Sequence, residues 1–385
     1  MAFAELYLLL LRLSEAMIIL RQTAPLFRHL TTIKRFYASK KFPPTMNQIH
    51  QETLRFVDPQ AHIIVLSDIY TKIRSADVHA FPDGNAFISE LHGGPVKNCT
   101  ASMDVKISDD EKQVEVIIKK LAPESDFHCE LAVPIRATIT VNSQHGASVK
   151  NIFGRAVRVK AKRFINVRDV RAECIHLESE GENISCLGLL LGKETVIETK
   201  GNGNITLDKL QGECCTCTTV DGSINTNCSY VDFSKFETAC GSLFLKNIHK
   251  RTEVVVNQKG KLNMLGVHGN LSVHCKGGLM NIQLSELCGD NVIRTENMES
   301  AIVNISEIIE NNAKIEASIE NDVNTINLDD SLQHLTAGLN ENKQNFKWNS
   351  ETPREAILKI YCKNEVTLGK SSWMEMTSLH MMPGK

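Results

Sequence analysis

The sequence predicts an all-β protein whose main part is a single-stranded β-solenoid with coils of roughly 19 residues, preceded by a short β-rich region. Glycines recur at nearly regular steps, and a large apolar residue stands two positions after each of the last five. The glycines are Gly181, Gly203, Gly222, Gly241, Gly260 and Gly278, and the apolar residues are Ile205, Ile224, Leu243, Leu262 and Met280. A turn residue that regularly precedes a β-type run is typical of a solenoid coil. The alternative is a globular sandwich of hairpins, since turns every ~10 residues also suit that fold.

Each predicted coil contains two strands. The first follows the glycine and alternates, as in Ile205-Thr206-Leu207, so its outer residues share one face. The second strand lies before the next glycine, where Cys217, Phe236, Val255 and Val273 are expected to occupy equivalent core positions. We expect the glycines and nearby residues such as Asn247 to supply the positive φ that turns require.

The N-terminus has the composition of a targeting segment. Residues 17–51 contain no Asp or Glu, while Arg21, Arg28 and Arg35 recur among apolar residues. This pattern predicts a mitochondrial presequence at 1–37, cleaved after Tyr37, with Met17 as an alternative start to Met1. A secretory signal is the competing interpretation, with the four leucines at 8–11 as its apolar segment.

The rest of the chain divides by its patterns. Residues 38–60 contain Pro43, Pro44 and Pro59, which predicts a linker with one short helix at 47–56. A β-rich region at 61–128 is expected next, followed by the solenoid at 129–376 and a frayed tail at 377–385. The ends of a solenoid must be covered, and Trp373 with nearby methionines is expected to cover the C-terminal end.

A short string before the coils carries a family resemblance. An alternating run, Cys129-Glu130-Leu131-Ala132-Val133, ends at Pro134, and a second run at 137–141 leads to the Gly146-led strand. This resembles the bacterial "putative adhesin" domain, in which a Val-Pro step precedes glycine-led coils. With the presequence and Ser372-Trp373, residues 60–375 also resemble the animal family with sequence similarity 185 member A. The resemblance implies a β-solenoid and assigns no activity to any residue.

Composition excludes some classes of function. The formal net charge is −2 and only 5% of residues are aromatic, so no nucleic-acid surface is indicated. No run of about 18 apolar residues predicts a membrane span. The 12 cysteines are spread along the chain rather than paired at tight spacings, so we expect reduced thiols that pack as small apolar residues.

Three groups of residues are candidate sites. Cys214, Cys215 and Cys217, with Cys228 or Cys240 one coil later, could hold a metal, but the spacing favours packing. His249 and His268 are 19 residues apart and should stack on one face, with His274 nearby. Carboxylates arranged for polysaccharide cleavage are disfavoured, because Asp208, Asp221 and Asp232 take different positions in their coils.

Six glycosylation-type triplets also occur, and this repeat produces them readily by placing Asn at corners before a strand Ser or Thr. They begin at Asn98, Asn183, Asn204, Asn227, Asn270 and Asn304. The sequence predicts no catalytic residue, no residue that binds a cofactor or a metal ion, and no bound cofactor.

The favoured hypothesis is a non-enzymatic mitochondrial solenoid that binds a protein partner. The alternatives are an extracellular adhesin-like module and a β-helix enzyme acting on polysaccharide.

Overall fold

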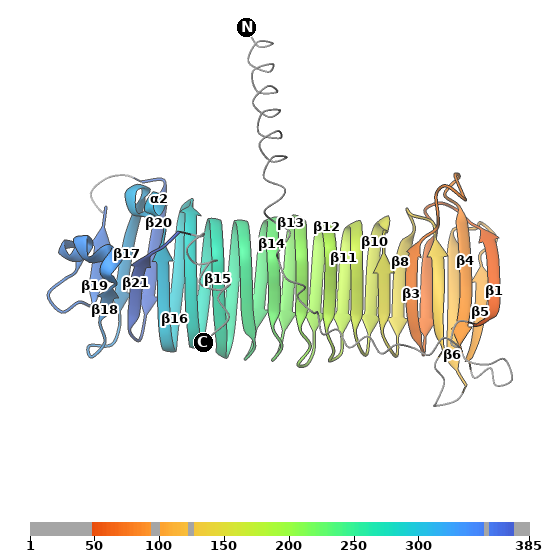
Figure 1. The fold of residues 1–385 in the computed structure, drawn as a ribbon, viewed down its shortest axis with the longest axis horizontal. Coiled ribbons are helices and arrows are strands. Elements are labelled where there is room, and N and C mark those ends of the chain that lie inside the picture. Colours follow the sequence, from red (N-terminus) through yellow and green to blue (C-terminus); the bar gives the residue numbers. More distant parts are fainter. Residues whose placement is uncertain (1–47, 94–100, 122–126, 350–353, 373–385) are drawn as a thin grey trace, which may run out of the picture. The chain divides into compact units, whose positions relative to one another are not determined.

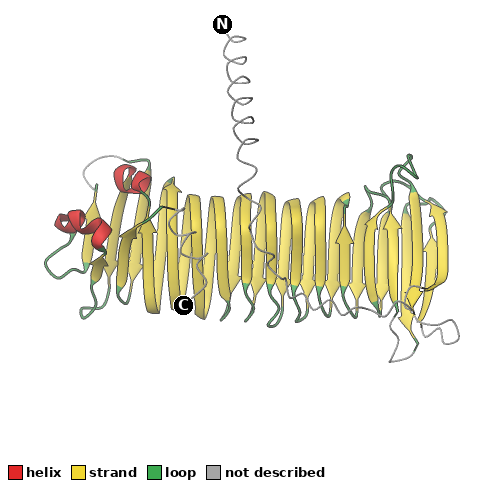
Figure 2. Ribbon diagram, viewed as in Figure 1, coloured by secondary structure: helices red, strands yellow, loops and turns green. Residues whose placement is uncertain are grey.

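The computed structural model describes residues 48–93, 101–121, 127–349 and 354–372, and these residues form 21 strands joined in one sheet (Figure 1). The predicted presequence, its cleavage site and the cap around Trp373 lie outside the described residues. In the described parts of the chain strand dominates, and the helices lie near one end of the stack (Figure 2). No helix among these residues is long and apolar enough to span a membrane.

The central coils stack in parallel, which confirms the predicted solenoid. Ile184, Ile205, Ile224 and Leu243 lie opposite one another in successive coils and are fully buried. The middle residues of the same triplets, such as Thr206, face outward. The strands of this part are β8 (Thr138–Ser143), β9 (Ala147–Lys150), β10 (Phe153–Ala161), β11 (Ile165–Ser179), β12 (Ile184–Thr199), β13 (Ile205–Thr219), β14 (Ile224–Thr238), β15 (Ser242–Leu287) and β16 (Gly289–Ile305).

The glycine spacing misplaces one core position. Phe236 pairs with Val254 rather than Val255, because β14 carries an extra residue between Tyr230 and Phe233 that β15 lacks. Val254 is buried and Val255 is half-buried on the outer side. The prediction that Val255 shares the core column of Cys217 and Phe236 is therefore wrong.

Two of the turn glycines, Gly222 and Gly241, serve close approach between coils rather than a positive φ. A Cβ on Gly222 would lie 1.9 Å from the carbonyl oxygen of Gly203, and one on Gly241 would lie 1.8 Å from that of Gly222. Neither residue has a positive φ. The expected conformational reason is wrong for these two positions, although Asn247 does have a positive φ, of 49°. Only a residue without a side chain lets the corners stack at strand spacing.

Buried hydroxyl groups complete the corners at Gly222 and Gly241. The hydroxyls of Thr219 and Thr238 accept hydrogen bonds from the backbone N–H of Gly222 and Gly241, at 3.2 and 2.9 Å. Thr199 in turn donates to Thr219, at 2.8 Å. This ladder satisfies turn donors that would otherwise be buried without a partner.

The N-terminal end of the stack does not follow chain order. β2 lies between β6 and β8, and β3 lies between β7 and β9, all in parallel. β4 and β5 then pair antiparallel with β7 and β6. The region at 61–128 therefore contributes coils to the solenoid itself. Its strands are β2 (His62–Ser67), β3 (Tyr70–Ser75), β4 (Ala86–Gly93), β5 (Ala101–Ile107) and β6 (Gln113–Lys120), and β7 is His128–Val133.

A strand replaces the short helix expected near the linker. β1 (Gln48–Phe56) pairs antiparallel with β4 along its length. The helix prediction is wrong because β4 would otherwise present an open edge, and covering that edge outweighs local preference.

The C-terminal end is also interleaved. β20 lies between β16 and β17, and β21 lies between β16 and β18, so the last coil in sequence is inserted before the preceding one. β19 pairs antiparallel with β17 on its other side. The elements are α2 (Glu307–Asn312), β17 (Ala313–Ile319), β18 (Ile326–Leu328), the 3₁₀ helix η2 (Asp330–Gly338), β19 (Asn345–Trp348), β20 (Ala356–Cys362) and β21 (Val366–Lys370).

A buried carboxylate joins three of these elements. Glu310 of α2 lies 2.5 Å from His334 Nε2 of η2 and 2.8 Å from Lys370 Nζ of β21. Only 9% of its side chain is exposed. Burial opposes its ionisation, but the contacts with Lys370 and His334 outweigh burial, and the pKa of Glu310 lies below its ordinary value of 4.5.

We expect Glu310→Gln to lower the free energy of unfolding of the C-terminal end by about 1–2 kcal/mol at pH 7. The lowered folded pKa means that the carboxylate stabilises the fold above pH 4.5, and this stabilisation is lost as the pH falls further. Urea denaturation at pH 7 and pH 3 measures this, and the difference between variant and parent should be smaller at pH 3 than at pH 7. Glu307→Gln, at an exposed position of the same helix, is the control. Equal losses for the two variants would contradict the assigned role.

Candidate functional site

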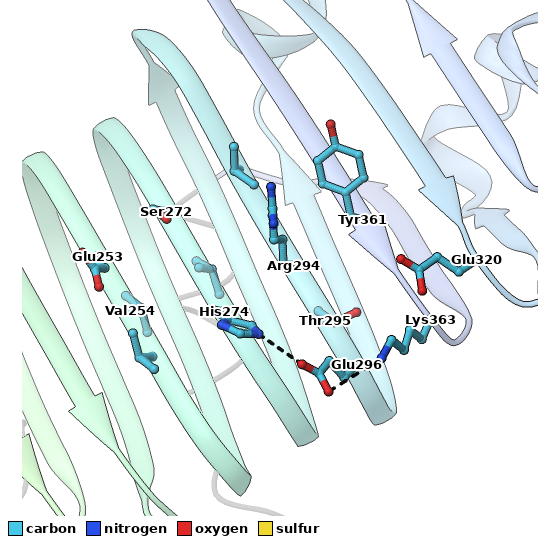
Figure 3. A pocket seen from close by; sticks show the side chains of 13 residues that line it. Glu253, Val254, Ser272, His274, Arg294, Thr295, Glu296, Glu320, Tyr361 and Lys363 are labelled. Atoms are coloured by element: carbon cyan, nitrogen blue, oxygen red, sulfur yellow. Dashed lines mark hydrogen bonds and ion pairs between the residues drawn. The ribbon is translucent and has the colours of Figure 1, made fainter.

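A shallow groove crosses β15, β16 and β20 on the outer face of the stack (Figure 3). Its volume is about 810 Å³. Strand pairing places His274, Arg294 and Tyr361 in one row across three neighbouring coils. The residues that line it are Glu253, Val254, Val255, Ser272, Val273, His274, Val292, Arg294, Thr295, Glu296, Glu320, Tyr361 and Lys363.

Strand alternation and side-chain size form the groove. Val273 and Ile293 point inward and are buried, so the residues on either side of them point outward. Ser272 and Val255 are small outward-facing residues beside longer ones such as Glu253. The floor is therefore formed by small side chains and the rim is charged.

Some of the charges in the groove pair with one another. Glu296 lies 3.3 Å from His274 Nε2 and 3.8 Å from Lys363 Nζ. Both contacts are drawn in Figure 3. Because these side chains are roughly one-third to one-half exposed, the pairs fix positions more than they stabilise the fold.

Two further charges have no ion-pair partner among the described residues. The Arg294 guanidinium lies over the Tyr361 ring, 5.4 Å from its centroid, and both side chains are exposed. Figure 3 shows the two side by side on neighbouring strands. The exposed Glu320 carboxylate also lines the groove. The groove thus offers a cation, an anion and an aromatic ring to a ligand.

No family model matches the chain. Three solved bacterial structures are similar to it. A putative adhesin from Parabacteroides merdae ATCC 43184 is 8% identical over 84% of this chain and 96% of that chain, with a TM-score of 0.37. A putative adhesin from Parabacteroides distasonis ATCC 8503 is 10% identical over 84% and 97%, with a TM-score of 0.36. A putative cell adhesion protein from Clostridium sporogenes ATCC 15579 is 8% identical over 84% and 99%, with a TM-score of 0.16. Similarity at this level supports no inference about this chain, whose fold and site follow from its own geometry.

The cysteine cluster is divided between two faces. Cys215 and Cys217 are buried in the core with their sulfurs 3.6 Å apart, while Cys214 lies on the outer side. The contact with Cys215, together with burial, raises the pKa of the Cys217 thiol well above its ordinary value. All 11 cysteines that the structure describes are free. Neutral buried thiols pack as small apolar groups, as the spacing suggests.

The predicted histidine stack is present and is longer than expected. The rings of His249 and His268 are stacked with centroids 4.8 Å apart, and Tyr230 stacks on His249 at 4.1 Å. Burial lowers the pKa of His249, and the neighbouring His268 adds to this effect. His274 lies instead in the groove. In the stack each ring covers the face of the next, which leaves mainly edges for a ligand.

The three aspartates have separate surroundings. Asp208 accepts a hydrogen bond from the Gly188 N–H, at 3.3 Å, and Asp232 pairs with Lys250, at 3.2 Å. Asp221 is exposed at a turn. The structure gives no contact that joins these carboxylates into one acid–base pair among the described residues.

The glycosylation-type triplets differ in accessibility. Asn304 is 8% exposed, and the Asn270 side-chain amide donates to two backbone carbonyls. Asn204 and Asn227 are exposed. Asn183 accepts a hydrogen bond from the backbone N–H of Asn204, at 2.8 Å, so its side chain joins two coils. Asn98 lies outside the described residues.

Proposed function

We propose that the protein is a non-enzymatic binding module whose groove across β15, β16 and β20 holds a segment of a protein partner. The observation that carries this proposal is the pair of uncompensated opposite charges, Arg294 and Glu320, in one groove with the exposed ring of Tyr361. Arg and Tyr are enriched among the side chains that contribute most to protein–protein affinity. A groove of about 810 Å³ suits a few side chains of a partner.

The mixed charge favours a protein ligand over the other classes considered. A polyanion such as nucleic acid would be repelled by Glu253, Glu296 and Glu320, which outnumber the groove's Arg and Lys side chains. Polysaccharide cleavage requires two carboxylates on either side of a bond, one of them protonated. Glu296 instead contacts His274 and Lys363, so its carboxylate is already held in ion pairs rather than facing a second carboxylate. A protein segment with both signs of charge matches this surface.

A crosslinking experiment tests the proposal. A photoreactive phenylalanine at position 361 should capture one defined partner in cells, whereas the same group at Leu187, which is 45% exposed, should not. The partner is then purified, and Arg294→Glu is expected to weaken its binding by about tenfold or more, since a favourable charge becomes a repelling one. Equal capture from both positions, or unchanged affinity of Arg294→Glu, would refute the assignment. Turnover of a defined substrate that is lost on mutation of a groove residue would refute the non-enzymatic part.

The cellular location remains a proposal from sequence. The basic segment before Ala38 supports mitochondrial import. The second candidate is an extracellular adhesin-like module, supported by the resemblance to the bacterial "putative adhesin" domain and by the exposed triplets at Asn204 and Asn227. Mass spectrometry of the mature protein separates them. An N-terminus at Ala38 without glycan excludes the extracellular candidate, and glycan on Asn227 excludes import.

A further inference from the structure

Two histidines and two glutamates lie together on the outer face near the N-terminal end of the stack, where the pairing of strands changes from parallel to antiparallel. The β4–β7 pairing places Glu90 opposite Glu130 and His92 opposite His128. The residues between them along each strand, Leu91 and Cys129, are buried. Alternation therefore directs all four side chains to the same outward face.

The donor atoms of Glu90, His92 and Glu130 converge, and His128 lies beside them. Glu90 Oε2 lies 2.8 Å from His92 Nε2, and Glu130 Oε1 lies 3.2 Å from His128 Nε2. Ligand atoms of Glu90, His92 and Glu130 all lie within 4.8 Å of one another. The two imidazole rings are stacked, with centroids 5.1 Å apart and an interplanar angle of 11°. Each side chain is between 13 and 31% exposed, so the cluster is partly sheltered and open to an ion.

We infer that Glu90, His92 and Glu130, with the neighbouring His128 as a fourth donor, form a binding site for a divalent transition-metal ion such as Zn²⁺. Two imidazole nitrogens and two carboxylate oxygens are a donor set that Zn²⁺ accepts in tetrahedral geometry. Ligands about 2.0 Å from such an ion are separated by about 3.3 Å, close to the two nitrogen–oxygen distances already present. The ligands lie on paired strands rather than on loops, so their backbone is already in place. The two imidazole rings lie in nearly parallel planes, so the His128 ring must turn before both nitrogens can face one ion.

The surrounding charge also favours a cation. Glu52 of β1 lies opposite Glu90, so this row carries three carboxylates. Lys72 of β3 lies 2.7 Å from Glu130 Oε1. One lysine leaves the row with a net negative charge, and the Lys72 side chain is 42% exposed, so it can turn into solvent when a metal ion enters. Lys72 therefore competes with the metal ion for Glu130.

Titration of the full chain with Co²⁺, with Zn²⁺ as competitor, tests the site. We expect one Co²⁺ per chain with visible d–d absorption and no thiolate-to-cobalt charge-transfer band, which separates this site from the cysteines. His92→Ala should weaken binding at least about a hundredfold because a ligand is lost. Lys72→Ala should tighten binding about tenfold, since a competing cation is removed.

Matched variants keep the result interpretable. His176→Ala, which removes a half-buried histidine outside the cluster, should leave Co²⁺ affinity unchanged. Glu90→Gln preserves the shape of the side chain and should still weaken binding about tenfold or more, so it replaces His92→Ala if circular dichroism shows that variant to be misfolded. Unchanged affinity in the ligand variants, binding through thiolates, or weaker binding in Lys72→Ala would each overturn the site.

Discussion

Gly241→Ala is expected to lower the free energy of unfolding by about 4 kcal/mol or more, an exceptional loss for the addition of one methyl group. The new Cβ would lie 1.8 Å from the Gly222 carbonyl oxygen and 2.7 Å from the Thr238 hydroxyl. The carbonyl belongs to the backbone of the preceding coil and cannot turn aside as a flexible side chain would. The two coils must separate locally, which disturbs the backbone hydrogen bonds between them. The hydrogen bond from the Gly241 N–H to the Thr238 hydroxyl is disturbed as well. Urea denaturation, monitored by far-UV circular dichroism, measures this decrease in the free energy of unfolding.

Gly181→Ala is the matched control for this prediction. Gly181 belongs to the same series of turn glycines, yet no heavy atom lies within 4 Å of the position that its Cβ would take. Its φ is not positive, so alanine fits without strain. We expect a change within about 0.5 kcal/mol, or a small gain from the less flexible unfolded chain. A similar loss for both variants would show that steric contact between coils is not what these glycines avoid.

The stacked coils were predicted from the sequence, but the role of glycines such as Gly222 was not. The spacing from Gly203 to Gly278 correctly indicated stacked coils, because every coil must return to the same corner. The physical reason was missed for Gly222 and Gly241, since each approaches a residue of a different coil. Gly278 does have the expected positive φ, of 102°. A period also does not locate a bulge, so the extra residue of β14 moved the core position from Val255 to Val254.

The groove was not predicted either, because its residues come from strands that are distant from one another in the sequence. Tyr361 is 67 residues beyond Arg294 in the chain, and it becomes a neighbour only because β20 is inserted beside β16. The cluster of Glu90 and His92 with Glu130 and His128 likewise depends on the return of β7 beside β4. Glu90 and His92 are two residues apart on one strand, as are His128 and Glu130 on the other, so each pair lies on one face of its strand. The sequence does not show that these two strands are neighbours, because that depends on the fold. In contrast, the stacking of His249 and His268 follows from the period alone.

Removal of residues 350–385 is expected to unfold the segment at 313–349 as well, although that segment is retained. β20 and β21 provide the parallel partners of β17 and β18, so without them β17 keeps only its antiparallel pairing with β19. The Lys370 partner of Glu310 is also lost. In hydrogen exchange, amides of 313–349 should lose their protection by about a hundredfold or more, as expected when a local cooperative unit opens.

The control is a chain that ends at Ser372, which keeps every described strand and should retain that protection. The outcome also distinguishes two orders of assembly. If β17 were stacked directly on β16, the shorter chain would keep protected amides at 313–349. The buried Asn291 argues against this, because its amide donates to the Ile357 carbonyl of β20, at 3.2 Å, and would lose this acceptor. The β16 edge is thus built to receive β20, so the last coil of the sequence completes the stack from within.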